Sequence, residues 1–360
     1  MPPGTPDPAL EDGERNLMAR AAWLCFAAGM THGEAAERLH VPSFKVQRLI
    51  ARATREGLIQ VFVNSPVAEC VRLEHELRAL YRLADCVVAP DLGEEALPLK
   101  SLAPAGAGLL MRVIQERSHD IIGLGHGRTL TAIVDHLPLM SAPHVNFVAL
   151  LGGLTTSFSA DPYDVIHRVS HRTGAAGYFL PLPFFANSAT DRAVMLAQYG
   201  VSHVMDLARR ATLCLVGIGA ASGEGFLAKS GAIGEAELRE LDRLGACSEI
   251  LGFFHDVDGK LVETEISRRI VTLTYEELGK GRLIAAAGGA DKLEAIRSVL
   301  RSGLLSGFIT DEATAARLVG EKTDNVTLMR SRANRKRAAG KAGAEDGAAS
   351  PPGRSERRRT

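Results

Sequence analysis

The hydrophobic positions of this chain follow two different periods, and the change between them divides the chain into two regions. From residue 14 to residue 56, apolar residues recur three and four positions apart, which predicts three short helices. From Cys86 onward, short apolar runs alternate with stretches of helical period. These patterns predict strands near 86–89, 120–125, 145–151, 177–182, 211–217, 249–255, 282–287 and 307–310, and helices at 99–117, 128–137, 162–173, 188–198, 235–244 and 291–301. Such alternation indicates βαβ units and a doubly wound, mainly parallel α/β domain.

The three N-terminal helices carry start and stop signals. Gly29 follows the first helix as a C′ residue, and Thr31 with Glu34 forms a capping box at the start of the second. His40 occupies the turn before the third helix, where a positive φ is expected and tolerable for histidine. Residues 58–63 alternate in hydrophobicity, which predicts a strand or wing. The arrangement is typical of a winged helix-turn-helix that binds DNA.

The third helix has an apolar face and a basic face. Its apolar positions point inward, and acidic residues are absent until Glu56, so guanidinium, ammonium and amide groups remain for base edges and phosphates. The alternative is a three-helix bundle with a structural or protein-docking role. The side chains expected to contact DNA are Ser43, Phe44, Lys45, Gln47, Arg48 and Arg52.

Length and composition support two domains and a tail. The 360 residues are 46% hydrophobic and 23% charged, as in an ordinary globular protein. The net charge is zero, but residues 330–360 contain ten Lys or Arg against three Asp or Glu. Such a tail either stays solvated or adds non-specific affinity for phosphates. The predicted division is a disordered segment at 1–13, a helix-turn-helix domain at 14–65, a linker with a connecting helix at 66–85, an effector domain at 86–322 and a disordered basic tail at 330–360.

Several classes of protein are disfavoured. The chain has no apolar run long enough for a membrane helix and no secretion signal at its start. Its five cysteines are scattered without a CxxC pair, which indicates reduced thiols in a cytoplasmic protein. His167 and His171 have the spacing of metal ligands on a helix, but no third ligand is suitably spaced. We therefore expect no metal site and no cofactor.

A glycine turn at GLGHGRT is the leading candidate for ligand binding. It ends a predicted strand and opens a helix, so its backbone N–H groups can face an anion. Gly125 and Gly127 allow close approach, Thr129 can donate its hydroxyl, and Arg128 can neutralise charge. The spacing is neither a dinucleotide fingerprint nor a Walker A loop. The alternative is a structural turn only.

Other candidates follow the ends of other predicted strands, where ligands of open α/β sheets bind. Gly153, Gly219 and Lys292 lie in glycine loops, although ordinary loop chemistry or a solvated lysine explains them equally well. Asp256 ends the FFHDVDG segment and can accept hydrogen bonds from sugar hydroxyls; either it or Asp258 could instead stabilise the turn.

The ordered motifs resemble a known family. TLTAIVDHL after GLGHGRT, LLGGL, GIGAAS, FFHDVDG, AAAGGADKLEAIRSVLRSGL and FITDEATAARL follow a helix-turn-helix of the right size. Over roughly residues 15–320 the chain resembles the SorC family of bacterial sugar-responsive transcription regulators. The resemblance implies an effector domain of the sugar-phosphate isomerase and deaminase type, and oligomers, dimers or tetramers, that bind operator DNA. It also implies that the effector's phosphate lies at the loop around Gly125 and that the segment around Asp256 helps to hold the effector.

The resulting hypothesis is a regulator of a carbohydrate or polyol operon rather than an enzyme. Its affinity for operator DNA would change when a sugar, polyol or sugar phosphate binds. The main alternative is a sugar-phosphate isomerase-like enzyme with an appended DNA-binding module, but no acid–base pair is recognisable, and no catalytic residue is predicted. A further alternative is a scaffold that binds DNA constitutively.

Overall fold

The computed structural model of the protein contains two units. The described residues are 8–56, 58–59, 67–94, 96–153, 164–223 and 225–320. Among them, no helix is both long and apolar enough to cross a membrane. The basic tail and most of the predicted wing lie outside these residues.

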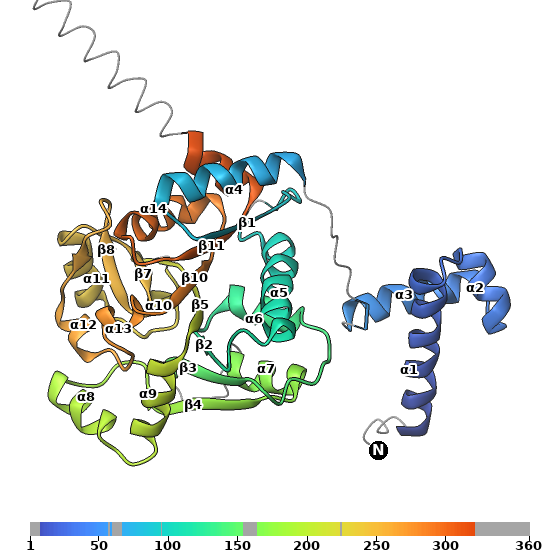
Figure 1. Cartoon of the computed structure of the whole chain (residues 1–360), viewed down its shortest axis with the longest axis horizontal. Coiled ribbons are helices and arrows are strands. Elements are labelled where there is room, and N and C mark those ends of the chain that lie inside the picture. Colours follow the sequence, from blue (N-terminus) through green and yellow to red (C-terminus); the bar gives the residue numbers. More distant parts are fainter. Residues whose placement is uncertain are drawn as a thin grey trace, which may run out of the picture.

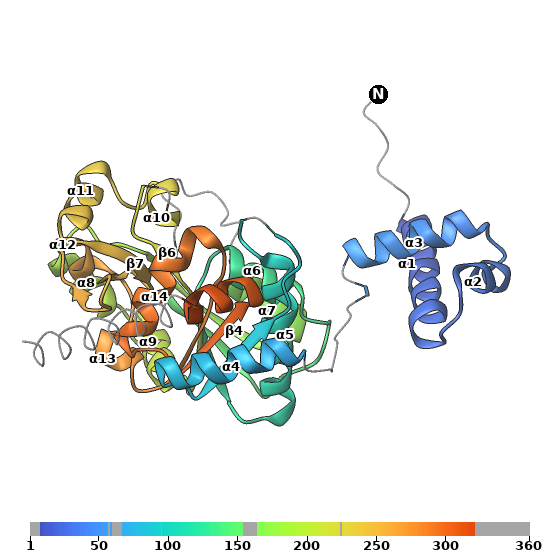
Figure 2. The ribbon, with the colours of Figure 1, turned by 90° about the horizontal axis from the view of Figure 1, so that it is seen from above.

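The N-terminal unit consists of three helices (Figure 2). They enclose a small apolar core. They are α1 (Pro8–Ala22), extended by a π-helical turn η1 (Trp23–Ala27), then α2 (His32–Leu39) and α3 (Ser43–Arg55). The expectation that residues 1–13 are disordered is wrong from Pro8 onward, because proline is well suited to the first position of a helix, which needs no N–H donor. The buried core residues are Met18, Ala21, Leu24, Ala35, Ala36, Val46, Leu49 and Ala53.

The connections within this unit follow the predicted signals. The Thr31 backbone N–H donates to Glu34 Oε2 at 2.8 Å, and the Glu34 N–H donates to Thr31 Oγ1 at 3.3 Å, which completes the capping box. His40 has φ 53° and ψ 44°, in the left-handed region. Its N–H donates to Glu37 O at 3.2 Å, so the turn before α3 forms without glycine.

The larger unit is built on a seven-stranded parallel sheet, which confirms the predicted α/β class (Figure 1). The strand order is β1-β11-β10-β5-β2-β3-β4. Their bounds are β1 (Asp85–Ala89), β2 (Ile121–Leu124), β3 (Asn146–Gly153), β4 (Ala176–Pro183), β5 (Leu213–Gly217), β10 (Arg282–Ala286) and β11 (Gly307–Asp311).

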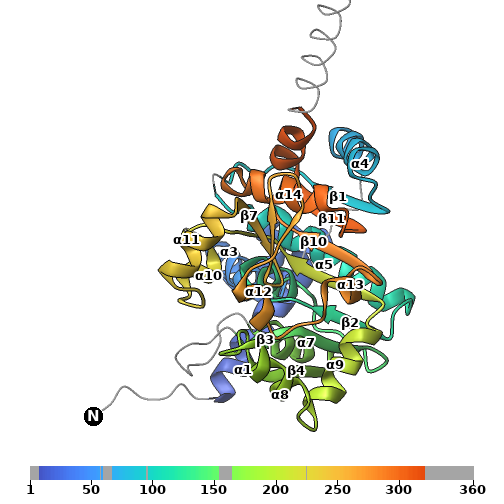
Figure 3. The same cartoon turned by 90° about the vertical axis from the view of Figure 1, so that its left-hand side faces the viewer.

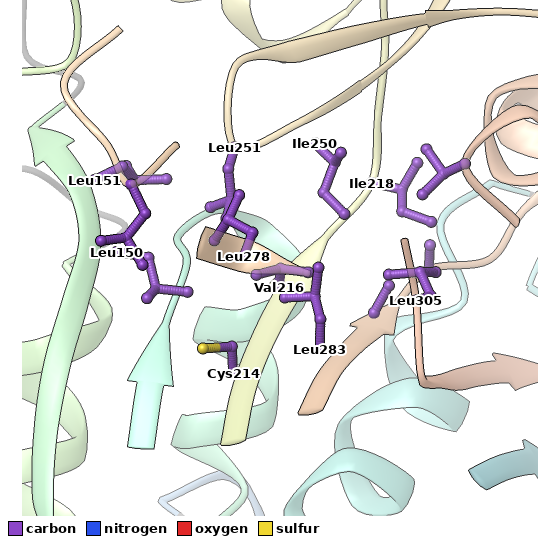
Figure 4. Close-up of a cluster of buried hydrophobic side chains, with 14 of the residues drawn as sticks. Leu150, Leu151, Cys214, Val216, Ile218, Ile250, Leu251, Leu278, Leu283 and Leu305 are labelled. Atoms are coloured by element: carbon purple, nitrogen blue, oxygen red, sulfur yellow. The ribbon is translucent and has the colours of Figure 1, made fainter. Parts of the chain in front are cut away.

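Apolar side chains cover both faces of this sheet, because successive residues of a strand point to opposite sides. On β5, Leu213 and Leu215 belong to one core layer, whereas Cys214 and Val216 belong to the other. The first layer is closed by α5 (Leu99–Glu116), α6 (Arg128–Asp135) and α7 (Val165–Thr173). The second layer, part of which Figure 4 shows, is closed by α4 (Ala68–Tyr81), α9 (Val201–Arg210), α14 (Leu293–Ser302) and a small second sheet.

The second sheet is antiparallel and has the order β6-β7-β8-β9. Its strands are β6 (Gly219–Ala220), β7 (Ala246–Ile250), β8 (Phe253–Asp256) and β9 (Leu261–Val262). The prediction of one strand at 249–255 is wrong, because Leu251 and Gly252 adopt φ values of 50° and 82° and reverse the chain. The remaining short elements of the larger unit are α8 (Ala189–Leu196), α10 (Phe226–Lys229), α11 (Glu235–Arg243), α12 (Glu265–Arg269), α13 (Tyr275–Leu278) and η2 (Ala290–Lys292). Helix α8 lies beside α9 near β4, whereas α11 lies beside β7 (Figure 3).

Helix α4 belongs to the larger unit and is not a linker. Leu73 and Leu77 are 1% and 0% exposed and pack with Val88 of β1 in the same core layer. The Val88 N–H also donates to Glu74 Oε1 at 3.0 Å. The predicted connecting helix within 66–85 is therefore present as α4, and its apolar face is buried against the sheet of its own chain.

Candidate functional site

A cleft lies where the strand order of the parallel sheet reverses. Strands β2 and β5 are neighbours, but the chain continues from β2 to β3 and β4 on one side and from β5 to β10 and β11 on the other. The connections that leave the two strands therefore diverge, which opens a crevice at their carboxyl ends. The polar side chains lining this cleft belong to His126, Arg128, Thr129, Glu249 and Lys292.

Apolar side chains form much of the rest of the cleft. Leu151 at the end of β3, Ile218 after β5 and Leu251 after β7 line it while also belonging to the buried core layer (Figure 4). Phe226, at the start of α10, adds an aromatic ring. A cleft with apolar walls and a few convergent polar groups is the usual form of a small-molecule site.

The start of α6 presents backbone donors to this cleft. Gly127 is the N-cap residue, and its φ of 107° with ψ of 173° is a conformation that only glycine adopts readily. Since glycine has no side chain to cap the helix, the first N–H groups of α6 remain available to a ligand. Arg128 is exposed, whereas the Thr129 side chain is buried in the first turn. Together with the helix dipole, these groups favour an anion.

Lys292 contributes a second positive charge from the opposite loop. Its ammonium group donates to the carbonyl oxygen of Ile218 at 2.9 Å, which holds the side chain across the cleft. Burial lowers the pKa of Lys292, and the nearby positive charge of Arg128 lowers it further, while Glu249 opposes the change. Lys292 is thus not a solvated surface residue. Lys292 and Arg128 both place positive charge at the cleft.

Glu249 on β7 is the acidic group of the cleft. Its Oε1 accepts a hydrogen bond from the Gly252 N–H at 2.5 Å. A Cβ atom on Gly219 would lie 2.6 Å from Glu249 Oε2, so glycine at that position leaves room for the carboxyl group. Burial raises the pKa of Glu249 to about 7, although the Gly252 hydrogen bond and Lys292 act in the other direction. The side chain can therefore accept or donate hydrogen bonds near neutral pH.

His126 is the remaining polar residue of the cleft. Its ring meets Phe184 edge to face, with centroids 5.7 Å apart, and lies 6.0 Å from the ring of Phe226. Burial lowers the pKa of His126 to about 3, so the imidazole is neutral at physiological pH. Its Nδ1 atom is shielded from solvent and has no hydrogen-bond partner among the described residues.

The structure brings five of the eight residues predicted for effector binding to this cleft. Gly127, Arg128, Thr129, Gly219 and Lys292 all line it, from three separate loops. That they meet follows from the parallel sheet, whose strands end at a common edge.

The other three predicted residues lie elsewhere. The Gly125 N–H donates to Leu215 O at 2.9 Å within the sheet, and the carbonyl oxygen of Gly153 accepts a hydrogen bond from the Phe184 N–H at 2.8 Å. Asp256 Oδ1 accepts hydrogen bonds from the N–H groups of Asp258 and Lys260, each at 2.9 Å. None of the three lines the cleft, and Asp256 stabilises the turn between β8 and β9, the alternative that the sequence left open.

Sequence reasoning missed His126 and Glu249. His126 lies inside the motif GLGHGRT. The prediction of an anion site there depended on the glycine, arginine and threonine residues, and it assigned no function to a neutral histidine ring. Glu249 lies within a segment predicted to form one strand, and only its position on a separate antiparallel sheet turns it toward the cleft. His167 and His171 are exposed on α7.

The N-terminal unit presents a second candidate site along α3. Ser43, Phe44, Lys45, Gln47 and Arg48 are exposed, while Val46, Leu49 and Ala53 are buried against the other helices. Phe44 retains 62% exposure despite being aromatic. The exposed set occupies the first two turns of the helix, the part that enters the major groove in helix-turn-helix proteins.

Arg52 differs from the rest of the predicted DNA-contacting set. Its guanidinium group pairs with Glu14 of α1 at 2.9 Å and with Glu56 at 2.5 Å. The sequence did not predict this arrangement, because Glu14 approaches α3 only when α1 packs against it. Arg52 thus links two helices of its own unit.

Comparisons with known proteins agree with this geometry. A family model described as "Putative sugar-binding domain" matches residues 65–320. The chain is 46% identical over 312 residues to the erythritol catabolism regulatory protein EryD of Brucella abortus (strain 2308), with 87% of this chain and 99% of that protein covered. It is 30% identical over 308 residues to the transcriptional regulator LsrR of Klebsiella pneumoniae, with 84% and 92% covered.

Solved structures show the same fold. The full-length sorbitol operon regulator SorC from Klebsiella pneumoniae matches with a TM-score of 0.63 and 24% identity, over 85% of this chain and 99% of that one. A domain of a possible sugar-binding transcriptional regulator from Arthrobacter aurescens TC1 matches with a TM-score of 0.61 and 27% identity, over 71% and 99%.

Proposed function

Because this chain belongs to the SorC family of sugar-binding transcriptional regulators, as the sequence motifs predicted, we propose that it controls a carbohydrate or polyol catabolic operon through effector-dependent binding to operator DNA. The observation that carries this proposal is the cleft between β2 and β5, in a chain that also has a helix-turn-helix unit. The named relatives are transcription regulators. We therefore assign the cleft a sensing role rather than a catalytic one.

The effector is a small polyhydroxylated compound, free or phosphorylated. The two cations, Arg128 and Lys292, and the N-terminus of α6 suit a phosphate or another anionic group. Glu249 suits hydroxyl groups, since sugar and polyol hydroxyls donate to carboxylate oxygens. The apolar walls exclude water from the carbon chain of the ligand.

The similarity to EryD narrows the choice of effector. Because that relative is named for erythritol catabolism and is 46% identical, erythritol and its phosphate are the first compounds to test. The residues proposed to hold the effector are Gly127, Arg128, Thr129, Gly219 and Lys292, with the addition of Glu249.

The exposed face of α3 is proposed to bind the operator. Lys45, Gln47 and Arg48 project from its first two turns, where an amide or guanidinium group can reach base edges and the cations can meet phosphates. Ser43 and Phe44 lie at the end of the helix that enters the groove deepest. Arg52 would hold α3 in position by its ion pair with Glu14 of α1.

Regulation would arise from a shift between arrangements of subunits. The family resemblance implies an oligomer, in which two recognition helices must match the spacing of two half-sites. An effector that prefers one arrangement by about 1 to 3 kcal/mol would change operator affinity about 5- to 150-fold. The basic tail at 330–360 would add affinity that depends on salt rather than on sequence.

A thermal-shift screen coupled to DNA retardation tests the proposal. We expect erythritol, its phosphate or a related compound to raise the melting temperature of the full chain and to alter retardation of its operator fragment. The variant Lys292→Met should lose both responses but keep its basal DNA binding. Turnover of the compound would support the enzyme alternative, and unchanged retardation with every compound would support a constitutive DNA-binding protein.

A further inference from the structure

Among the described residues that line the cleft, His126 is the one with a shielded side-chain polar atom that has no hydrogen-bond partner. Its imidazole lines the cleft, yet Nδ1 is shielded from solvent without a partner. An unsatisfied buried polar atom is disfavoured, and its presence in a ligand cleft calls for an explanation. Thr129, Glu249 and Lys292 already pack or bond within the protein, so His126 stands apart from them.

The surroundings of the ring fix both its position and its charge. Phe184 is 2% exposed and meets the imidazole edge to face, and the ring of Phe226 lies 6.0 Å from it, centroid to centroid. Phe184 is itself held by the backbone, because its N–H donates to Gly153 O at 2.8 Å and its carbonyl oxygen accepts from the Val271 N–H at 2.9 Å. A ring bounded by two phenyl groups and an apolar wall cannot readily carry a positive charge.

The two ring nitrogens are in different environments. In a neutral imidazole, one nitrogen carries the proton and the other accepts. A buried N–H without an acceptor is rarer than an under-used acceptor, which places the proton on Nε2 and leaves Nδ1 as the shielded lone pair. Nε2 is not among the shielded, unpartnered atoms, so it remains accessible to solvent, and among the described residues it has no hydrogen-bond partner. Within the described part of the chain, the ring therefore offers one N–H donor with no protein acceptor.

We infer that the neutral imidazole of His126 donates a hydrogen bond from Nε2 to a hydroxyl oxygen of the bound sugar or polyol and so helps to determine effector specificity. This inference rests on the proposed function of the cleft. Different groups of one loop would then contact different parts of the ligand. The start of α6 and Arg128 attract the anionic end of the ligand, and His126 donates to a hydroxyl group on its carbon chain. A neutral donor suits a hydroxyl oxygen, which is a weaker acceptor than phosphate and needs no opposite charge.

Two substitutions distinguish a recognition role from a structural one. His126→Phe keeps an aromatic ring next to Phe184 and Phe226 but removes both nitrogens. His126→Gln loses the ring but places an amide N–H donor near the position of Nε2. Melting temperatures of the full-length variants should stay close to that of the parent protein, which separates loss of binding from loss of fold.

The experiment measures dissociation constants by calorimetry with erythritol, erythritol 4-phosphate and inorganic phosphate. We expect His126→Phe to weaken binding of the hydroxylated compounds roughly 3- to 10-fold, the effect of one neutral hydrogen bond. Inorganic phosphate, which has no carbon chain, should bind the parent and the variant equally. His126→Gln should recover most of the lost affinity.

The outcomes separate this inference from the function on which it rests. Equal affinity of the parent and His126→Phe for the hydroxylated compounds would overturn the role of His126 alone. Equal weakening toward all three compounds, without recovery in His126→Gln, would assign His126 a purely structural role and overturn the inference. Failure of the parent protein to bind any of the three would contradict the proposed effector class itself.

Discussion

The buried carboxyl group of Glu249 predicts that the stability of the larger unit depends on pH. The folded protein raises the pKa of Glu249 to about 7 from an ordinary value of 4.5, chiefly through burial. Because the folded state holds the proton more tightly than the unfolded chain, the stabilisation is fully present below the unfolded value and is lost as pH rises through about 7. The variant Glu249→Gln keeps the shape of the side chain and removes the titration.

The expected magnitude follows from the difference between the two pKa values. One pH unit corresponds to about 1.4 kcal/mol, so the interval from 4.5 to about 7 sets an upper limit of about 3.5 kcal/mol. The value of about 7 already includes the opposing effect of Lys292, but the Glu249 side chain is only partly buried, so solvent screening reduces the expected effect to about 1 to 2 kcal/mol. Glu249→Gln should therefore be about as stable as the parent at low pH and relatively more stable by this amount near pH 8.

Urea unfolding of both proteins across this range measures the effect. The free energies of unfolding are compared at each pH, and the difference between variant and parent isolates Glu249 from all other titrating groups. The matched control is Glu116→Gln, which makes the same chemical change at an exposed position in the last turn of α5. If the difference between Glu249→Gln and the parent were the same at every pH, as for an exposed carboxyl group, the argument from burial would be refuted.

Three further predictions test other parts of the molecule. Arg48→Ala should weaken operator binding and reduce its salt dependence by about one counterion, because Arg48 is exposed on α3. Arg52→Ala should mainly destabilise the N-terminal unit, because Arg52 pairs with Glu14 of α1. Equal weakening of operator binding by both variants in DNA retardation would contradict this difference in roles. Leu77→Ala should lower the free energy of unfolding of the larger unit by about 2 to 5 kcal/mol because the side chain is fully buried, as denaturant titration against the exposed control Leu139→Ala would show. Gly127→Ala, at φ 107°, should cost about 1 to 3 kcal/mol and weaken effector binding measured by calorimetry, and an unchanged affinity would refute the role of the α6 N-terminus.

Local patterns were sufficient for most of the secondary structure and for part of the cleft. The parallel strands fall within a few residues of the predicted ranges, because long apolar runs between helical stretches are a strong signal. The glycine turn at Gly127 and the lysine at 292 were also predicted, since both follow strands that end at the same edge of a parallel sheet. The predicted strand at 249–255 failed, because two successive left-handed residues, only one of them glycine, reverse the chain there.

The sequence by itself determined the family, the α/β class, the basic helix α3 and the loops in which a ligand could bind. Each of these depends on residues that are close together in the chain, where spacing and backbone preference are readable directly. The tertiary structure alone decided that α4 covers the sheet, that Arg52 pairs with α1, and that Glu249 and His126 complete the cleft while Asp256 does not. These outcomes depend on contacts between distant segments, and the burial and charge that such contacts create have no local pattern in the sequence.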